Sequence, residues 1–334
     1  MPTPVRTRRN LTSLAIGDTP LRWTRVPTGH DGGTGWLHSG IAALPDGSLL
    51  VAHPEGRDLI RISETGDSTR ITTPLTEMHC LTVATTADDG MVVWAADNGH
   101  RFVHDTPDYD EIHARGRVVA LDLDGRVVRE LDAPAAFGPW SPTSVALVDT
   151  DDPGSDVWVA DGYGQSLIHR YSADRVLLTT LDGTESGTRF DCPHGILIRT
   201  EGAEKVLYVA DRSNRRIVVF GLDGTYLRTL ATDVVDSPSS MVDYRGHLVV
   251  TELFGALAIF DGDDYLGHIG SSLRDHDGPG WPNRIDDTGQ TVAPELAEGI
   301  FNSPHGITVR DTTLYLTEWM IGGRVVRLDP VAAH

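Results

Sequence analysis

The stretch that decides the fold is residues 193–230, which read PHGILIRTEGAEKVLYVADRSNRRIVVFGLDGTYLRTL. It holds four short runs rich in β-branched and aromatic residues, separated by polar or Asp-Gly turns. This pattern is typical of a four-stranded antiparallel meander. The pattern occurs six times along the chain with a period of roughly 40 to 60 residues, which predicts the blades of a β-propeller.

We therefore expect one all-β domain, a six-bladed propeller spanning residues 1–334, because no long segment has helical periodicity. The sixth copy ends after its third strand. Residues 20–27 have no hairpin partner nearby, so we expect them to supply the missing outer strand and remove an exposed sheet edge. The predicted blades cover residues 35–75, 76–132, 138–182, 190–231, 236–270 and 301–330, the last completed by residues 20–27.

Two insertions interrupt the repeats, at residues 98–116 and 270–302. Connections of this length in a compact fold are usually functional or disordered. Both should emerge near one face of the propeller, and we expect them to be lids over a site there.

Composition excludes several functional classes. The chain carries a net charge of −20, and Lys205 is its only lysine, which argues against nucleic-acid or anionic-membrane partners and leaves a small molecule. The sequence has no run of 18 apolar residues and no apolar secretory segment. Its two cysteines, Cys80 and Cys192, make no disulfide framework, so we expect a cytoplasmic protein in which both are buried small residues.

One repeat position carries the strongest functional signal. In the turn before the first strand of each copy, it reads Ser39, His79, Thr143, His194, Ser239 and His305. Alternate blades of a six-membered ring lie about 120° apart, so the three histidines should meet on the axis. Three imidazoles converging on a point favour one zinc ion with an open coordination position, although iron, copper and nickel stay open. The alternative is three polar turn residues beside a water-filled channel.

A second layer of titratable residues ends the second strand of each copy. Because that strand returns to the face of the histidines, each member should lie near the repeat position of its own blade. Some of them could fix the tautomer of a metal-binding imidazole, whereas the alternative role is to cap turns or bind backbone amides. The layer comprises His53, Asp97, Asp161, Asp211, Glu252 and Glu318.

The residues that follow these acids differ between copies, as substrate-facing positions should. Tyr163 could act as general acid or base, and Arg212 could hold a carboxylate or carbonyl oxygen. Trp319 is placed to line the substrate funnel. The structural alternatives are a tyrosine packed on the funnel wall and an arginine paired with a neighbouring acid.

The Pro-His-Gly and Val-Ala-Asp-Arg segments resemble the NHL-type blades of the peptidyl-α-hydroxyglycine α-amidating lyase family. The resemblance spans most of residues 35–330 and is densest over 140–230. It implies a six-bladed propeller with one axial zinc on His79, His194 and His305, a catalytic Tyr163 and an active-site Arg212. The family cleaves a carbinolamide C–N bond and releases an amide and an aldehyde.

Two positions depart from that family. The family carries an acid after its third zinc histidine that helps to hold a structural calcium, whereas this chain has Gly306, which argues against calcium. The arginine expected near the end of the first blade's second strand is matched only by Arg57, which is shifted. The fold and the metal therefore transfer better than the substrate.

Taken together, these patterns predict a zinc-dependent lyase that performs elimination, dealkylation or hydration at a heteroatom-bearing carbon. One alternative is a metal-dependent hydrolase, such as the six-bladed lactonases. Another is a non-catalytic NHL interaction scaffold, since propellers often serve as scaffolds. The scaffold hypothesis predicts no stoichiometric metal. The substrate, the reaction direction and the oligomeric state are left open.

Overall fold

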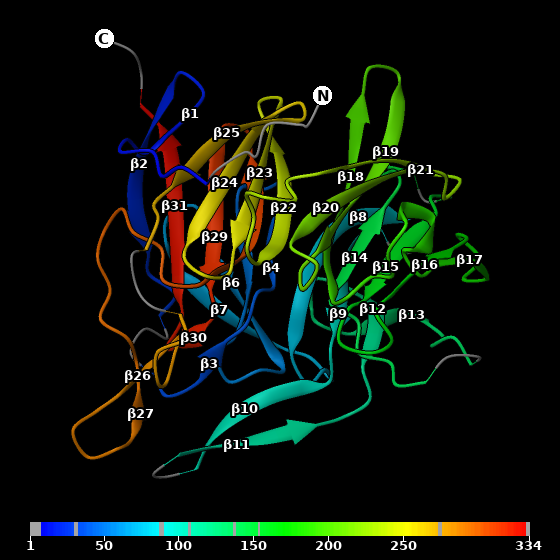
Figure 1. Cartoon of the computed structure of the whole chain (residues 1–334). Coiled ribbons are helices and arrows are strands. Elements are labelled where there is room, and N and C mark those ends of the chain that lie inside the picture. The colour runs from blue at the N-terminus through cyan, green and yellow to red at the C-terminus, as the bar shows by residue number, and fades with distance from the viewer. Residues whose placement is uncertain are drawn as a thin grey trace.

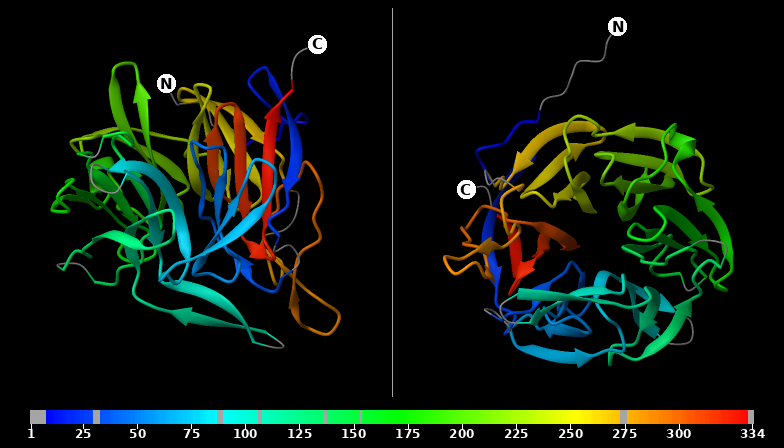
Figure 2. Two further views of the ribbon diagram at one scale, coloured as in Figure 1. Left: turned by 180° about the vertical axis from the view of Figure 1, so that it is seen from behind. Right: turned by 60° about the horizontal axis from the view of Figure 1, so that its bottom comes forward.

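The computed structural model describes residues 8–29, 33–86, 90–105, 108–135, 138–152, 154–272 and 276–331. Six antiparallel sheets, five of four strands and one of five, follow one another around a common axis, which confirms the predicted six-bladed propeller (Figures 1 and 2). Among the described residues, one 3-10 turn, Thr184–Ser186, is the only helical element. That part of the chain has no helix with the length and apolarity to cross a bilayer.

In blades one to five, the strands follow one another outward from the axis in chain order. Blade one holds β4 (Ile41–Ala43), β5 (Leu49–Ala52), β6 (Asp58–Ile62) and β7 (Ser68–Thr72). Blade two holds β8 (Met78–Thr86), β9 (Gly90–Asp97), β12 (Arg117–Leu121) and β13 (Val127–Leu131). Blade three holds β14 (Ser144–Leu147), β15 (Val157–Asp161), β16 (Leu167–Tyr171) and β17 (Leu177–Leu181).

The second half of the ring repeats this order. Blade four holds β18 (Pro193–Glu201), β19 (Glu204–Asp211), β20 (Arg216–Gly221) and β21 (Tyr226–Leu230). Blade five holds β22 (Pro238–Tyr244), β23 (His247–Glu252), β24 (Ala256–Asp261) and β25 (Asp264–Ile269). Blade six holds β28 (Pro304–Arg310), β29 (Thr313–Glu318), β31 (Arg324–Pro330) and β2 (Thr19–Val26).

Blade six contains strands from both ends of the chain. Strand β2 pairs antiparallel with β31, from Leu21 opposite Pro330 to Val26 opposite Val325. This confirms the expected closure of the ring by the N-terminal strand. A short strand, β1 (Ala15–Ile16), extends the outer edge of the same sheet.

Alternation along the strands explains how the blades pack. In β19, Val206, Tyr208 and Ala210 pack toward blade five, in one cluster with Leu248 of β23. The intervening Leu207 and Val209 pack toward blade three. Because successive side chains of a strand point to opposite faces, an apolar run without polar breaks buries both faces of the sheet. Each blade is thus a layer of the core between its two neighbours.

The inner strands approach closely around the axis, which explains the glycine of the Pro-His-Gly motif. A Cβ at Gly195 would lie 2.1 Å from the carbonyl oxygen of Ser239 in the next blade. A Cβ at Gly306 would lie 1.8 Å from the carbonyl oxygen of Ser39. Real Cβ atoms do not approach oxygen so closely, so only glycine fits at these two positions.

Both insertions lie at one end of the ring, as Figure 1 shows. The first forms a hairpin of β10 (His100–Asp105) and β11 (Asp108–His113), and the second contains β26 (Arg284–Ile285) and β27 (Thr291–Val292). They touch where Thr291 Oγ1 lies 3.4 Å from Asp108 Oδ1. Beside them, β3 (Trp36–Leu37) pairs with β30 (Met320–Ile321).

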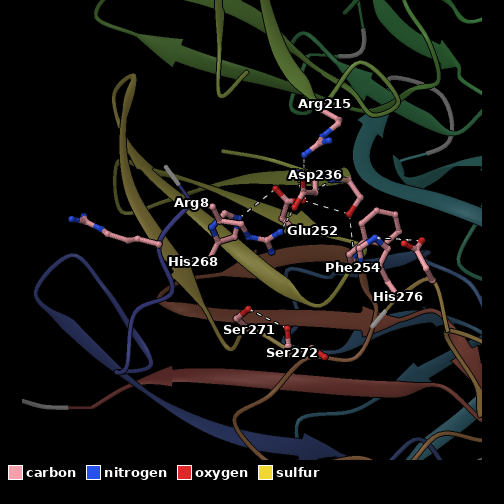
Figure 3. A network of polar contacts seen from close by, with 12 residues as sticks. Arg8, Arg215, Asp236, Glu252, Phe254, His268, Ser271, Ser272 and His276 are labelled. Carbon is pink, nitrogen blue, oxygen red and sulfur yellow. Dashed lines mark hydrogen bonds and ion pairs between the residues drawn. The ribbon is translucent and has the colours of Figure 1, made fainter. Parts of the chain in front are cut away.

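The N-terminal segment is fastened to the outer edge of blade five. Asn10 forms a parallel bridge with His268 of β25, and the Leu11 N–H donates to the His268 carbonyl at 2.7 Å. Arg8 and Arg215 both donate to the carboxylate of Asp236 (Figure 3). The segment therefore covers the sheet edge and links blade five to blade four.

Candidate metal centre

The three histidines of the repeat position come together at the axis. Their ring centroids are 4.5 Å apart for His79 and His194, 4.8 Å for His194 and His305, and 5.1 Å for His79 and His305. None of the three is more than 3% exposed. Each occupies the extra position of a β-bulge at the start of its inner strand. A bulge re-aims one side chain, and here it turns each imidazole toward the axis.

Backbone carbonyls set the tautomer of two of these imidazoles. His79 Nδ1 donates to the Thr143 carbonyl at 2.6 Å, and His194 Nδ1 donates to the Ser239 carbonyl at 2.9 Å. Each acceptor is the repeat-position residue of the next blade. With the proton on Nδ1, each Nε2 presents a lone pair to the axis, which is the state that binds a metal.

The two lone pairs face each other, because His79 Nε2 and His194 Nε2 lie 3.0 Å apart. Burial lowers the pKa of both imidazoles well below 6.5, so neither readily takes a proton to relieve the repulsion. A shared cation would relieve it. Two nitrogens on one tetrahedral zinc lie about 3.3 Å apart, given Zn–N bonds of about 2.0–2.1 Å, so this pair fits zinc.

His305 is held differently from its two partners. Its Nε2 accepts from Arg212 Nη2 at 2.9 Å, and its Nδ1 is buried with no hydrogen-bond partner. The carbonyl that its repeat symmetry would offer, that of Ser39, instead accepts from Thr317 Oγ1 at 2.9 Å. Metal binding by His305 Nε2 therefore requires the Arg212 guanidinium to move away from it.

A fourth histidine, His38, joins the cluster and was missed by the sequence analysis. Its ring lies 4.3 Å from His79 and stacks 5.1 Å from His305. The ligand atoms of His38, His79 and His305 all lie within 4.8 Å of one another, a set that leaves out His194. His38 Nδ1 is 3.1 Å from Glu77 Oε1, at ion-pair distance but without hydrogen-bond alignment. The sequence feature that could have identified His38 is its place directly before Ser39, the repeat position of blade one.

Tyr163 and Arg212 both contact the histidine cluster. The Tyr163 hydroxyl lies 3.1 Å from His194 Nε2, 3.3 Å from His79 Nε2 and 3.2 Å from Arg212 Nη1. The residue as a whole is 41% exposed, so its ring faces solvent while its hydroxyl sits among the imidazoles. Burial of the hydroxyl raises the pKa of Tyr163 to about 12, against the opposing effect of Arg212. The phenol thus holds its proton at neutral pH.

The second layer of acids holds the turns that carry the histidines. Asp97 accepts from the Thr76 N–H at 2.7 Å, directly before β8, and Asp211 accepts from the Asp191 N–H at 2.8 Å, directly before β18. Their counterparts do the same in the other blades: Asp161 with the N–H of Ser141, Glu252 with those of Asp236 and Ser237, and Glu318 with those of Asn302 and Ser303.

Of the two roles that the sequence leaves open for the acids, these contacts match the binding of backbone amides. Carbonyls of the next blade orient His79 and His194, and in the described contacts the acids bond backbone amides. Burial nevertheless raises the pKa of Asp97, Asp161 and Asp211 despite these bonds. His53, the sixth member, is buried and its Nδ1 accepts from the Glu55 N–H at 3.0 Å.

An aromatic wall, defined as Trp36, Phe102, Trp281 and Trp319, stands beside the histidines. The Trp319 ring lies 6.4 Å from His305, 5.3 Å from Trp36 and 6.1 Å from Trp281. Trp36 stacks on Phe102 at 4.3 Å. Because Phe102 and Trp281 belong to the two insertions, both insertions contribute side chains to the surroundings of the centre.

The wall continues toward blade five. Phe254 packs edge-on against Trp281 at 5.3 Å. It also stacks on His276 at 3.9 Å (Figure 3). The aromatic surface thus runs from the hairpin β10–β11 to the loop after β23. An apolar or aromatic part of a ligand could lie against this surface, since aromatic rings pair favourably when their centroids are roughly 4.5–7 Å apart.

On the other side of the histidines, a cavity of about 450 Å³ follows the inner strands along the axis. Its walls are mainly aliphatic and come from all six blades, and they include His79 and Ser39. The histidine cluster therefore lies at one end of this cavity, with His79 in its wall.

No protein-family model and no curated protein matches the sequence. Among solved structures, a streptogramin B lyase has a TM-score of 0.57 at 15% identity, covering 93% of this chain and 98% of that one. A catalytically inactive histidine-to-alanine variant of virginiamycin B lyase from Staphylococcus aureus, solved with quinupristin, has a TM-score of 0.55 at 14% identity, with coverages of 94% and 100%.

A protein of unknown function from Bacteroides thetaiotaomicron is similarly close in fold, with a TM-score of 0.56 at 12% identity, covering 93% of this chain and 76% of that one. At identities this low, the likenesses show a shared β-propeller fold and nothing finer. The resemblance to the amidating lyase family stays a prediction.

Proposed function

We propose that this protein is a zinc-dependent lyase that acts on a small molecule at the axis of the propeller. His79, His194 and His305 would hold the metal. Zinc bound there would polarise a substrate oxygen and lower its pKa. The observation that carries the proposal is the pair of neutral imidazoles whose Nε2 atoms face each other at 3.0 Å, with both Nδ1 protons committed to carbonyls.

Proton transfer falls to Tyr163. Its hydroxyl is the one phenol in contact with both His79 and His194 among the described residues, and it holds its proton until a neighbouring cation lowers its pKa. It can therefore protonate a leaving group or, once ionised, remove a proton from the carbon next to the bond that breaks.

Arg212 is placed to stabilise negative charge that develops during the reaction. Its guanidinium touches the Tyr163 hydroxyl, His305 Nε2 and, at 2.7 Å, the Ser239 hydroxyl. Its Nε is buried without a hydrogen-bond partner. Movement of the guanidinium from His305 to a substrate oxygen would free the histidine and satisfy that nitrogen in one step.

The surroundings support a substrate with an apolar or aromatic portion. The aromatic wall lies beside His305 and is contributed in part by the two insertions, which would act as lids. The names of two structural neighbours, both lyases on the same fold, are consistent with lyase chemistry. Both cysteines are free thiols, in keeping with the cytoplasmic location that we also propose.

Elemental analysis by inductively coupled plasma mass spectrometry tests the metal directly. A variant that lacks one of the metal ligands should contain about one equivalent of zinc per chain less than the tag-free wild-type protein. His79→Ala and His305→Ala should both lose it, and His194→Ala against His38→Ala decides which of these two imidazoles completes the set. His104→Ala, on an insertion strand, is the matched control. If none of the four variants changes the zinc content, the axial site does not exist.

Product analysis then separates the reaction classes. A lyase divides its substrate without adding water, whereas a hydrolase yields fragments whose summed mass exceeds that of the substrate by one water. Substrates screened should carry an aromatic group near a carbon that bears oxygen or nitrogen. Two fragments that together contain the extra water would move the protein to the hydrolases while leaving the metal site in place, whereas a single hydrated product would keep it among the lyases.

A further inference from the structure

A second group of metal-ligating side chains lies on the β10–β11 hairpin, outside the axial centre. His100 and His113 are directly opposite each other in the antiparallel register. Glu111 lies two residues before His113, so all three side chains share one face of the hairpin. None of them belongs to a propeller blade.

The donor atoms already converge. Glu111 Oε2 lies 3.1 Å from His100 Nε2 and 3.2 Å from His113 Nε2. The two imidazoles stack with centroids 4.7 Å apart and an interplanar angle of 25°. All three ligand atoms lie within 4.8 Å of one another. Two ligands on one tetrahedral zinc are separated by about 3.3 Å, so these distances match the edges of a coordination shell.

We propose that His100, Glu111 and His113 form a second binding site for a divalent transition metal, with zinc as the expected ion. Two imidazoles and one carboxylate suit zinc and disfavour magnesium and calcium, which prefer all-oxygen sets. The side chains of Glu111 and His113 are 52% and 67% exposed, so water completes the shell and the metal exchanges with solvent. This site does not depend on the proposed lyase function.

The bound metal would fix the hairpin beside the axial centre. On the same face, Phe102 packs on His100 at 4.9 Å and stacks on Trp36 of the aromatic wall. The Tyr109 hydroxyl donates to the Thr34 carbonyl at 2.7 Å, which ties the far end of the hairpin to the loop before β3. Cross-linking the two strands at His100 and His113 therefore holds Phe102 against the wall.

The test uses the full-length, tag-free protein in a His79→Ala background, which removes the axial site by itself. Titration with Zn²⁺ in a calorimeter should show one site. Glu111→Gln and His113→Ala should each weaken it at least about tenfold, because each removes one of three ligands. His104→Ala, on the same face but outside the set, should leave it unchanged.

A second measurement addresses the structural role. Hydrogen–deuterium exchange in the same His79→Ala background should slow in residues 100–105 and 108–113 when Zn²⁺ is added, and Glu111→Gln should abolish the slowing. Equal zinc affinity in all variants, or binding at millimolar concentration only, would mean an adventitious ion and overturn the proposal. Because the axial site is absent from this background, neither outcome bears on the lyase function.

Discussion

Acid should destabilise this protein through His169, a histidine of β16 that lies outside the axial histidine cluster. Its side chain is 0% exposed, packs 5.6 Å from the Trp140 ring, and its Nδ1 bonds Thr180 Oγ1 at 2.9 Å. Burial lowers the pKa of His169 from 6.5 to about 4. The folded protein therefore binds a proton at this site less readily than the unfolded chain does.

The sign and size of the effect follow from that difference. Above pH 6.5 the site is neutral in both states and costs nothing. As the pH falls from 6.5 toward 4, only the unfolded chain is protonated, and the free energy of unfolding declines. A difference of about 2.5 pKa units at about 1.36 kcal/mol each gives a loss of about 3 kcal/mol. That is a large part of the roughly 5–15 kcal/mol that stabilises a typical domain.

Urea unfolding followed by tryptophan fluorescence at several pH values between 7 and 4 measures this loss. His169→Gln keeps a polar partner for Thr180 and does not titrate, so its stability should fall by about 3 kcal/mol less than that of wild type. His104→Gln, at an exposed position, should behave like wild type. A chelator in every sample removes any contribution from bound metal. Parallel curves for His169→Gln and wild type would refute the reasoning.

Three further predictions concern the site and its scaffold. Tyr163→Phe removes the hydroxyl between His79, His194 and Arg212, so it should keep the zinc content of wild type while lowering turnover by about 10²–10⁴-fold, measured on the substrate found by the product screen. Gly306→Ala places a Cβ 1.8 Å from the Ser39 carbonyl oxygen, so it should lower the free energy of unfolding, measured by thermal unfolding, by about 3 kcal/mol or more. In the control Gly154→Ala the new Cβ lies 3.3 Å from the nearest atom, so the loss should be under about 0.5 kcal/mol. Glu318→Gln leaves buried Arg324 without its carboxylate and should cost about 3–5 kcal/mol in urea unfolding, which an unchanged midpoint would contradict.

The fold was predictable because every blade repeats the same local signals. Short apolar runs separated by turns such as Leu222-Asp223-Gly224 mark strands at regular spacing, and the unpaired stretch near the N-terminus had one open edge to fill. The sequence predicts only a long connection at the first insertion, whereas the structure has the paired strands β10 and β11 there. Its strands are mostly polar and pair only with each other, so they lack the apolar alternation by which strands are recognised.

The site was partly predictable for a related reason. A shared repeat position identified His79, His194 and His305, because equivalent positions of the blades lie around the same point on the propeller axis. His38 lies one residue outside that register, and a bulge shifts which residue faces the axis, so spacing alone did not reveal it. Backbone amides were one of the two expected partners of the acids, but the particular amides could not be predicted, because every residue except proline carries an N–H whatever its side chain.

Blade six is built from strands of both ends of the chain, and it also carries His305 of the histidine cluster. His79 and His194 sit on blades made from continuous stretches of chain, whereas His305 sits on a sheet whose outer strand comes from residues 19–26. A nascent chain can complete the first two ligand positions before its C-terminal strands have formed. The third arrives only when the two ends of the chain have met. A ring that fails to close would therefore lack one histidine of the proposed metal centre, and zinc content would then report whether the two ends of the chain had met.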